Sequence, residues 1–209
     1  MKFLTDFADQ AVVLPVALAV GLVLAAMGWR RGALVWVGVV GATLGAVLVL
    51  KLGFMACGPV FTPWGLHSPS GHTAAASVLA GGFVTLLAGS PPAALAIAVL
   101  AAAMFGFSRV ELGYHSLPEV FIGAAIGIAG AVVLSRLADR PPAMRRPLRV
   151  LGVAIVVALL LHGGHLQAEQ VIWQFAKGRL DFVPACRAYG SGEAKALTAD
   201  PASPTRGTN

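Results

Sequence analysis

Long apolar stretches separated by short polar blocks limit what this chain can fold into. Of its 209 residues, 57% are hydrophobic and 11% are charged, which is too apolar for a soluble domain with a charged surface. Six stretches have about the length and composition of a helix that crosses a bilayer. They are Ala11–Met27, Ala33–Leu50, Thr73–Ala88, Ala93–Phe107, Val120–Leu134 and Leu148–Leu161. The sequence therefore predicts an all-α integral membrane protein built as a six-helix bundle.

The segments at the two ends of the chain differ from this helical part. Residues 1–10 form a short N-terminal segment, and residues 11–164 are predicted to make up the membrane domain. Residues 165–190 alternate apolar and charged side chains, which is typical of a helix lying in the membrane interface. Residues 191–209 are rich in Pro, Ala, Gly and Thr without periodicity, so we expect them to be disordered.

Basic residues predict the orientation, because short cytoplasmic loops retain Lys and Arg. Two predicted loops carry them, and an even number of crossings separates these loops, so both should be cytoplasmic. They contain Arg30 and Arg31 in one loop and Arg136, Arg140, Arg145, Arg146 and Arg149 in the other. We interpret the net charge of +6 as a topology signal and as contact with anionic headgroups, not with nucleic acid.

Two polar blocks, residues 68–72 and 108–119, open directly onto apolar runs. Counting crossings brings both blocks, and Lys51 at the end of the second run, to the extracytoplasmic face. Charged and titratable side chains are costly near hydrocarbon, so residues retained there indicate a functional site.

These side chains suit phosphate chemistry. Ser70 and Gly71 precede a helical run, whose free N–H groups form an anion site. Arg109 can bind phosphate oxygens through two hydrogen bonds, and Lys51 can add a point charge. Two histidines, His72 and His115, could then supply a general acid and a nucleophile without a metal or another cofactor.

The same residues resemble the signature of the type 2 phosphatidic acid phosphatase (PAP2) superfamily, which includes membrane lipid phosphatases and soluble vanadium haloperoxidases. Its second block, Pro-Ser-Gly-His, matches residues 69–72 without change, and its third block matches Ser108, Arg109 and His115 at the same spacing. The resemblance implies that His115 is the nucleophile, that His72 is the general acid, and that Lys51, Ser70, Gly71 and Arg109 bind phosphate.

Two positions depart from the family pattern. Glu119 stands where the third block ends in Asp, and its carboxylate is expected to orient the ring of His115. The first block of the family is a lysine followed, after six residues, by Arg-Pro. Lys51 and Pro59 match it, but Gly58 stands where the arginine belongs. The loss of that arginine weakens the expected anion site, since a charge-assisted hydrogen bond contributes about 1.5–3 kcal/mol.

The resemblance implies a metal-independent phosphatase that hydrolyses a lipid phosphate monoester or diphosphate through a phosphohistidine intermediate. We expect it in the bacterial inner membrane, with the active site on the extracytoplasmic side. The alternative is a related protein that binds or transports lipid phosphates after losing turnover. The sequence leaves open which lipid phosphate is bound and the oligomeric state. Cys57 and Cys186 are both predicted on the extracytoplasmic side, where a disulfide can persist; we expect them to pair, the alternative being two separate thiols.

Overall fold

The computed structural model of this chain is all-helical over the part that it describes. That part comprises residues 3, 6–56, 66–138, 147–164, 170–172 and 174–175, and it contains no β-strand. The main helices are α2 (Gln10–Ala26), α3 (Arg30–Ala56), α5 (Gly71–Ala88), α6 (Pro91–Glu111), α7 (Leu117–Leu137) and α8 (Pro147–Leu161). The helical fold class predicted from the sequence is confirmed.

Four of these helices, α3, α5, α6 and α7, are long and apolar enough to cross a membrane. The other two, α2 with 17 residues and α8 with 15 residues, are apolar but shorter. At 1.5 Å per residue they extend about 26 Å and 23 Å, slightly less than a hydrocarbon core of about 30 Å. The described residues therefore establish a helical membrane protein, and the count of six crossings stays a prediction.

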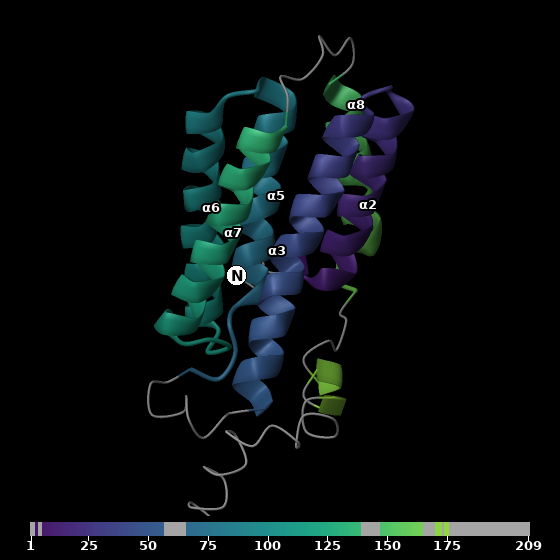
Figure 1. Cartoon of the computed structure of the whole chain (residues 1–209). Helices are drawn as coiled ribbons and strands as arrows, with labels where there is room; N and C mark the ends of the chain where they lie inside the picture. Colours follow the sequence, from purple (N-terminus) through teal and green to yellow (C-terminus); the bar gives the residue numbers. More distant parts are fainter. Residues whose placement is uncertain are drawn as a thin grey trace, which may run out of the picture.

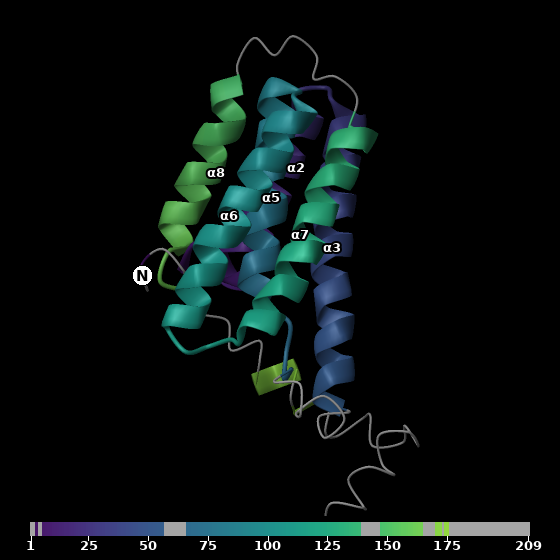
Figure 2. The same cartoon turned by 90° about the vertical axis from the view of Figure 1, so that its left-hand side faces the viewer.

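Helix α5 lies at the centre of the bundle and packs against α3, α6 and α7 (Figure 1). Helix α2 joins α3 on one side and α8 on the other, so α8 is attached to the bundle mainly through α2 (Figure 2). The buried Trp36 of α3 donates its indole N–H to the carbonyl of Ala17 in α2 at 2.8 Å. This bond helps to hold the α2–α8 pair against the central helices.

Glycines on α7 allow it to approach the first turns of α5. A Cβ added at Gly123 would overlap the carbonyl oxygen of Ser70, and one at Gly127 would overlap that of Ala74. Small residues that let two backbones approach closely are a feature of helix packing in membranes. The start of α7 is therefore fixed against the start of α5, where both polar blocks lie.

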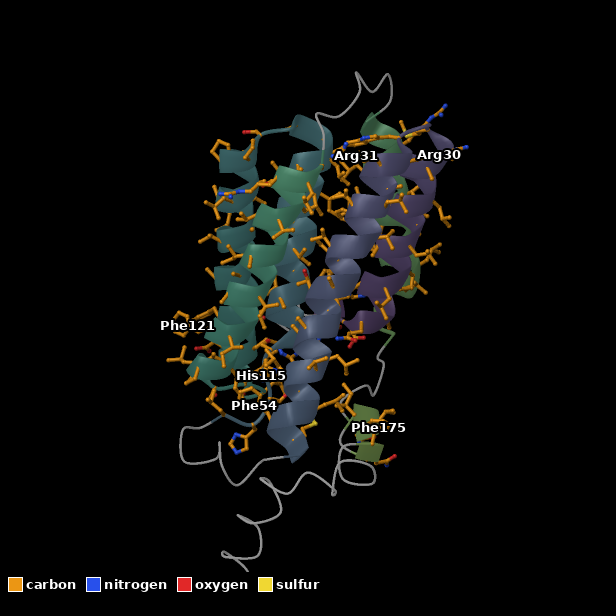
Figure 3. The ribbon with its side chains drawn as sticks, viewed as in Figure 1. Arg30, Arg31, Phe54, His115, Phe121 and Phe175 are labelled. Atoms are coloured by element: carbon orange, nitrogen blue, oxygen red, sulfur yellow. The ribbon has the colours of Figure 1, made fainter. Side chains whose placement is uncertain are left out.

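The arginines of the two predicted cytoplasmic loops that the structure describes lie at one end of the bundle. Arg30 and Arg31 lie at one end, whereas His115 and Phe54 lie toward the other (Figure 3). Arg136 is in the last turn of α7, a helix that begins beside His115 and runs toward the arginine end. Arg30, Arg31 and Arg136 thus lie at the end of the bundle opposite the polar blocks, as crossing counts predict.

Two helix boundaries differ from those expected. Helix α3 continues to Ala56, so Lys51 lies within it and not at its end. Helix α6 continues to Glu111, so Arg109 lies in its last turn and not in a loop. The boundaries expected from the sequence lie where the apolar runs end. A helix can continue beyond its apolar run where its polar side chains find hydrogen-bond partners. The added turns carry both basic side chains on rigid backbone.

Candidate active site

Helix α5 begins at the candidate site with a capped N-terminus. Ser70 is its N-cap: the hydroxyl oxygen accepts a bond from the backbone N–H of Thr73 at 3.4 Å and lies 2.9 Å from the Thr73 hydroxyl. The backbone N–H of Ser70 donates to the carbonyl of Glu119 at 3.0 Å. Ser70 is fully buried and Gly71 is buried beside it. The start of α5 is therefore locked to α7 before any ligand binds.

His115 lies in the short link between α6 and α7. Gly113, two residues after the end of α6, has a φ of +69°, which suits glycine, and bonds run from Gly113 N–H to Val110 O and from Tyr114 N–H to Arg109 O. This is the Schellman pattern of helix termination. Because α7 begins two residues after His115, the ring is held between two ordered helix ends.

Glu119 connects the two polar blocks. Its Oε2 lies 3.0 Å from Nδ1 of His115 and accepts a bond from the backbone N–H of Ser116 at 3.0 Å. Its Oε1 accepts bonds from the backbone N–H groups of His67 at 2.6 Å and Ser68 at 2.7 Å. An ionised carboxylate only accepts, so Nδ1 of His115 carries the proton and Nε2 carries the lone pair. The side chain of Glu119 thus sets the tautomer of His115 and holds the 66–70 segment beside it.

The two basic side chains approach the same place from different helices. Lys51 donates from Nζ to the hydroxyl of Ser68 at 2.8 Å, and its Cε lies 3.8 Å from where a Cβ on Gly71 would be. Lys51 therefore extends over the first turn of α5. Arg109 is buried, with its guanidinium stacked 4.4 Å from the centre of the Tyr114 ring. Cation–π contacts of this kind fix the plane of a guanidinium.

His72 is on the first turn of α5 and lies close to a carboxylate. Its Nε2 is 3.9 Å from Oδ2 of Asp9, which is buried. The other oxygen of Asp9 accepts the backbone N–H of Ala11 at 2.8 Å and so caps α2. Arg109, His115 and Lys51 are the other ionisable groups that act electrostatically on His72. His72 thus lies among three groups that are or can become cationic, with one carboxylate next to it.

The structure brings together, at one end of the bundle, the candidate site residues Lys51, Ser70, Gly71, His72, Arg109, His115 and Glu119. Sequence reasoning missed two members, Ser68 as the partner of Lys51 and Asp9 as the carboxylate beside His72. Asp9 precedes an apolar helix, which is an N-cap signal that marks the start of α2 but does not indicate what lies opposite. His67 is exposed, and its Nδ1 lies 3.8 Å from Oε1 of Glu119.

Some of the sequence predictions lie outside the described residues. These are Gly58, Pro59, the cysteine pair Cys57 and Cys186, most of the interfacial segment 165–190 and the tail 191–209. Within the described ranges, no group of three or more His, Cys, Asp or Glu side chains is arranged to hold a metal ion. The groups gathered here are two cations, a helix N-terminus and two imidazoles, each imidazole with a carboxylate beside it. The cations and the helix N-terminus suit an anionic ligand.

This fold and this site define a helical membrane protein with two histidines, a lysine and an arginine gathered at one end of its bundle. The family model of the PAP2 superfamily matches residues 43–142, which include both polar blocks and Lys51. The chain belongs to the PAP2 superfamily, as the motifs predicted. Because members of this superfamily are phosphatases, membership supports a phosphoric ester hydrolase.

A curated relative is similar to this chain. It is an "Uncharacterized 22.5 kDa protein in cps region" of Klebsiella pneumoniae, 31% identical over 152 residues, which are 68% of this chain and 70% of the relative. No solved structure matches the chain significantly.

Proposed function

We propose that this protein is a membrane lipid phosphatase that hydrolyses a phosphate monoester or diphosphate through a phosphohistidine intermediate. The hydrogen bond between His115 Nδ1 and Glu119 Oε2 carries the proposal, because it leaves Nε2 of His115 as a nucleophile in a cationic site. The superfamily gives the reaction class, and the contacts of this chain support the role of each residue.

The phosphate would bind at the start of α5. The first-turn N–H groups that follow Ser70 and Gly71 offer hydrogen bonds and the positive end of the helix dipole. Lys51 extends over this turn, and the buried Arg109 acts electrostatically on His72 within it. The two would neutralise the equatorial oxygens of the transferring group. Ser68 holds Lys51 in position until the ligand arrives.

The first chemical step is attack of His115 Nε2 on phosphorus. A nitrogen–phosphorus bond forms as the bond from phosphorus to the lipid oxygen breaks. The proton on His72 moves to that oxygen, so the lipid leaves as an alcohol or, from a diphosphate, as a monophosphate. Glu119 stabilises the positive charge that develops on His115 through its bond to Nδ1.

The second step is hydrolysis. Water attacks the phosphohistidine, His72 takes a proton from that water, and the electron pair of the nitrogen–phosphorus bond returns to Nε2. Inorganic phosphate leaves, and both rings regain their starting protonation. Asp9, 3.9 Å from His72, supports the protonated form of that ring among the surrounding cations.

A lipid substrate follows from the position of the site. His72 and Glu119 lie in the first turns of α5 and α7, which are long and apolar enough to span a membrane. A phosphate bound there is at a membrane boundary, where a lipid headgroup is presented. With the short helices α2 and α8 also crossing, the arginine end is cytoplasmic and the site is extracytoplasmic, in a bacterial inner membrane.

The second candidate is a protein that binds or transports lipid phosphates without turnover. Gly58 in place of the family arginine is the observation that favours it. One experiment separates the two functions: purified protein in detergent is incubated with a panel of lipid phosphates, with and without EDTA, and phosphate release is measured.

We expect release that EDTA leaves unchanged, and an acid-labile phosphoprotein that is trapped from ³²P-labelled substrate and absent in His115→Ala. Saturable binding with no release and no phosphoprotein would establish the non-catalytic function instead.

A further inference from the structure

An apolar cavity of about 390 Å³ lies beside the central helix, away from the polar site. It is lined by α2, α5 and α8 and by Phe7; from α5 it takes Leu79 and Phe83, and from α8 it takes Ala158 and Leu159 among others. Its volume is in the range of pockets that hold small ligands. The cavity exists because α8 packs on α2 and makes at most marginal contact with α5 (Figure 2).

The helical register of α5 aligns this cavity with His72. Leu79 is seven residues after His72 and Phe83 is eleven after it, so all three lie on one face of the helix. Leu79 lies about 10 Å from His72 along the helix axis, because each residue adds 1.5 Å. The cavity is therefore on the His72 side of α5, deeper in the bundle.

The N-terminal segment 7–9 connects the two places. Asp9 faces His72, Ala8 packs against Ala76 one turn further along α5, and Phe7 lines the cavity. The ring of Phe7 contacts that of His162, just beyond α8, with centroids 4.5 Å apart. One short segment thus borders both the His72 side of the polar site and the wall of the apolar cavity.

We propose that this cavity holds the hydrocarbon tail of the substrate, entering beside His72. The inference rests on the proposed function: if His72 protonates the leaving oxygen, the carbon chain on that oxygen must begin at His72. An amphiphile with an anionic head and an apolar tail matches a cationic site and an apolar cavity that lie along the same face of α5, with residues 7–9 bordering both. The occupant is therefore the substrate's own alkyl or isoprenoid chain.

The cavity contributes orientation rather than affinity. A lipid tail in the bilayer is already in hydrocarbon, so moving it into a protein cavity gains little transfer free energy. Holding the first part of the tail instead fixes the leaving oxygen opposite Nε2 of His115, which lowers the barrier by positioning. The effect of blocking the cavity should therefore appear in kcat/KM for long substrates.

The test is Ala158→Phe, which adds an aromatic ring to the cavity wall, with Leu159→Trp as a second variant at an exposed lining position. Ala96→Phe is the matched control, because Ala96 lies on an exposed face of α6. For each protein, kcat/KM is measured for dodecyl phosphate and for butyl phosphate. We expect both cavity variants to lose about tenfold on dodecyl phosphate alone, with the control unchanged.

Photo-crosslinking tests the cavity without requiring turnover. If wild-type protein releases no phosphate, the proposed catalytic function is wrong, but binding of the tail in the cavity can still be measured. A dodecyl phosphonate carrying a diazirine midway along its chain should label peptides of α2, α5 or α8, which line the cavity, in wild-type protein and not in Ala158→Phe. Labelling confined to α3, α6 or α7, or equal losses on both substrates in both variants, would overturn the inference. The inference would also be overturned if Ala158→Phe dissociated a dimer while the ratio of kcat/KM for dodecyl phosphate to that for butyl phosphate stayed the same. The cavity would then be filled by a second copy of the chain.

Discussion

Glu119 Oε2 lies 3.0 Å from Nδ1 of His115, and the other oxygen of the same carboxylate accepts the backbone N–H groups of His67 and Ser68. One side chain therefore orients the proposed nucleophile and holds the loop that precedes α5. The extra methylene of Glu, compared with the Asp of the family pattern, gives the carboxylate the reach for both tasks in this backbone.

Glu119→Gln should lower kcat/KM by about 100-fold, the upper range for loss of a group that orients a functional histidine. The amide keeps the size of the side chain, but either orientation places an NH₂ group against N–H donors that now bond to oxygen. Glu119→Asp should also fall below wild type, because a shorter side chain cannot keep both sets of bonds. Phosphate release and thermal unfolding are measured together, and an aspartate variant more active than wild type would contradict this account.

Asp9→Asn should reduce activity more at high pH than at low pH. Burial and the charges of Arg109, His115 and Lys51 all disfavour protonated His72, and the Asp9 carboxylate opposes them, so removing its charge lets the ring lose its proton at lower pH. The alkaline limb of the kcat/KM profile should therefore move to lower pH.

The matched comparison for this prediction is Asp9→Ala. Asn caps a helix as well as Asp does, so Asp9→Asn should keep wild-type stability, whereas Asp9→Ala should also lose about 1 kcal/mol from the cap of α2. Superimposable pH profiles for wild type and Asp9→Asn would remove Asp9 from the mechanism.

The sequence predicted the parts of the site that depend on local spacing. The cap at Ser70 and the pair His115 and Glu119, four residues apart around a helix start, follow from short-range rules. The approach of Asp9 to His72 and of Lys51 to Ser68 could not be predicted, because each joins segments that only tertiary packing brings together. The same holds for the cavity, which depends on how α8 leans on α2.

Gly123→Ala should destabilise the protein and reduce phosphate release together. The added Cβ would overlap the carbonyl oxygen of Ser70, so α7 must move away from α5 and carry Glu119 away from the 66–70 segment. Overpacking of this kind costs about 1–3 kcal/mol. Gly41→Ala is the control, because a Cβ there meets nothing within 4 Å and alanine favours the helix. Equal unfolding temperatures for the two variants would show that the contact of α7 with α5 is not tight.

Cysteine labelling tests the orientation that the proposed function requires. In a background with Cys57 and Cys186 replaced by serine, one reporter is Glu111→Cys, at the exposed end of α6 beside the site, and the other is Ser90→Cys, in the turn between α5 and α6 at the arginine end. A membrane-impermeant maleimide applied from the extracytoplasmic side of intact cells or spheroplasts should label Glu111→Cys and should reach Ser90→Cys only after permeabilisation. The reason is that the end carrying Arg30, Arg31 and Arg136 is retained in the cytoplasm. The reverse pattern would place the site in the cytoplasm, where its lipid would have to come from the inner leaflet.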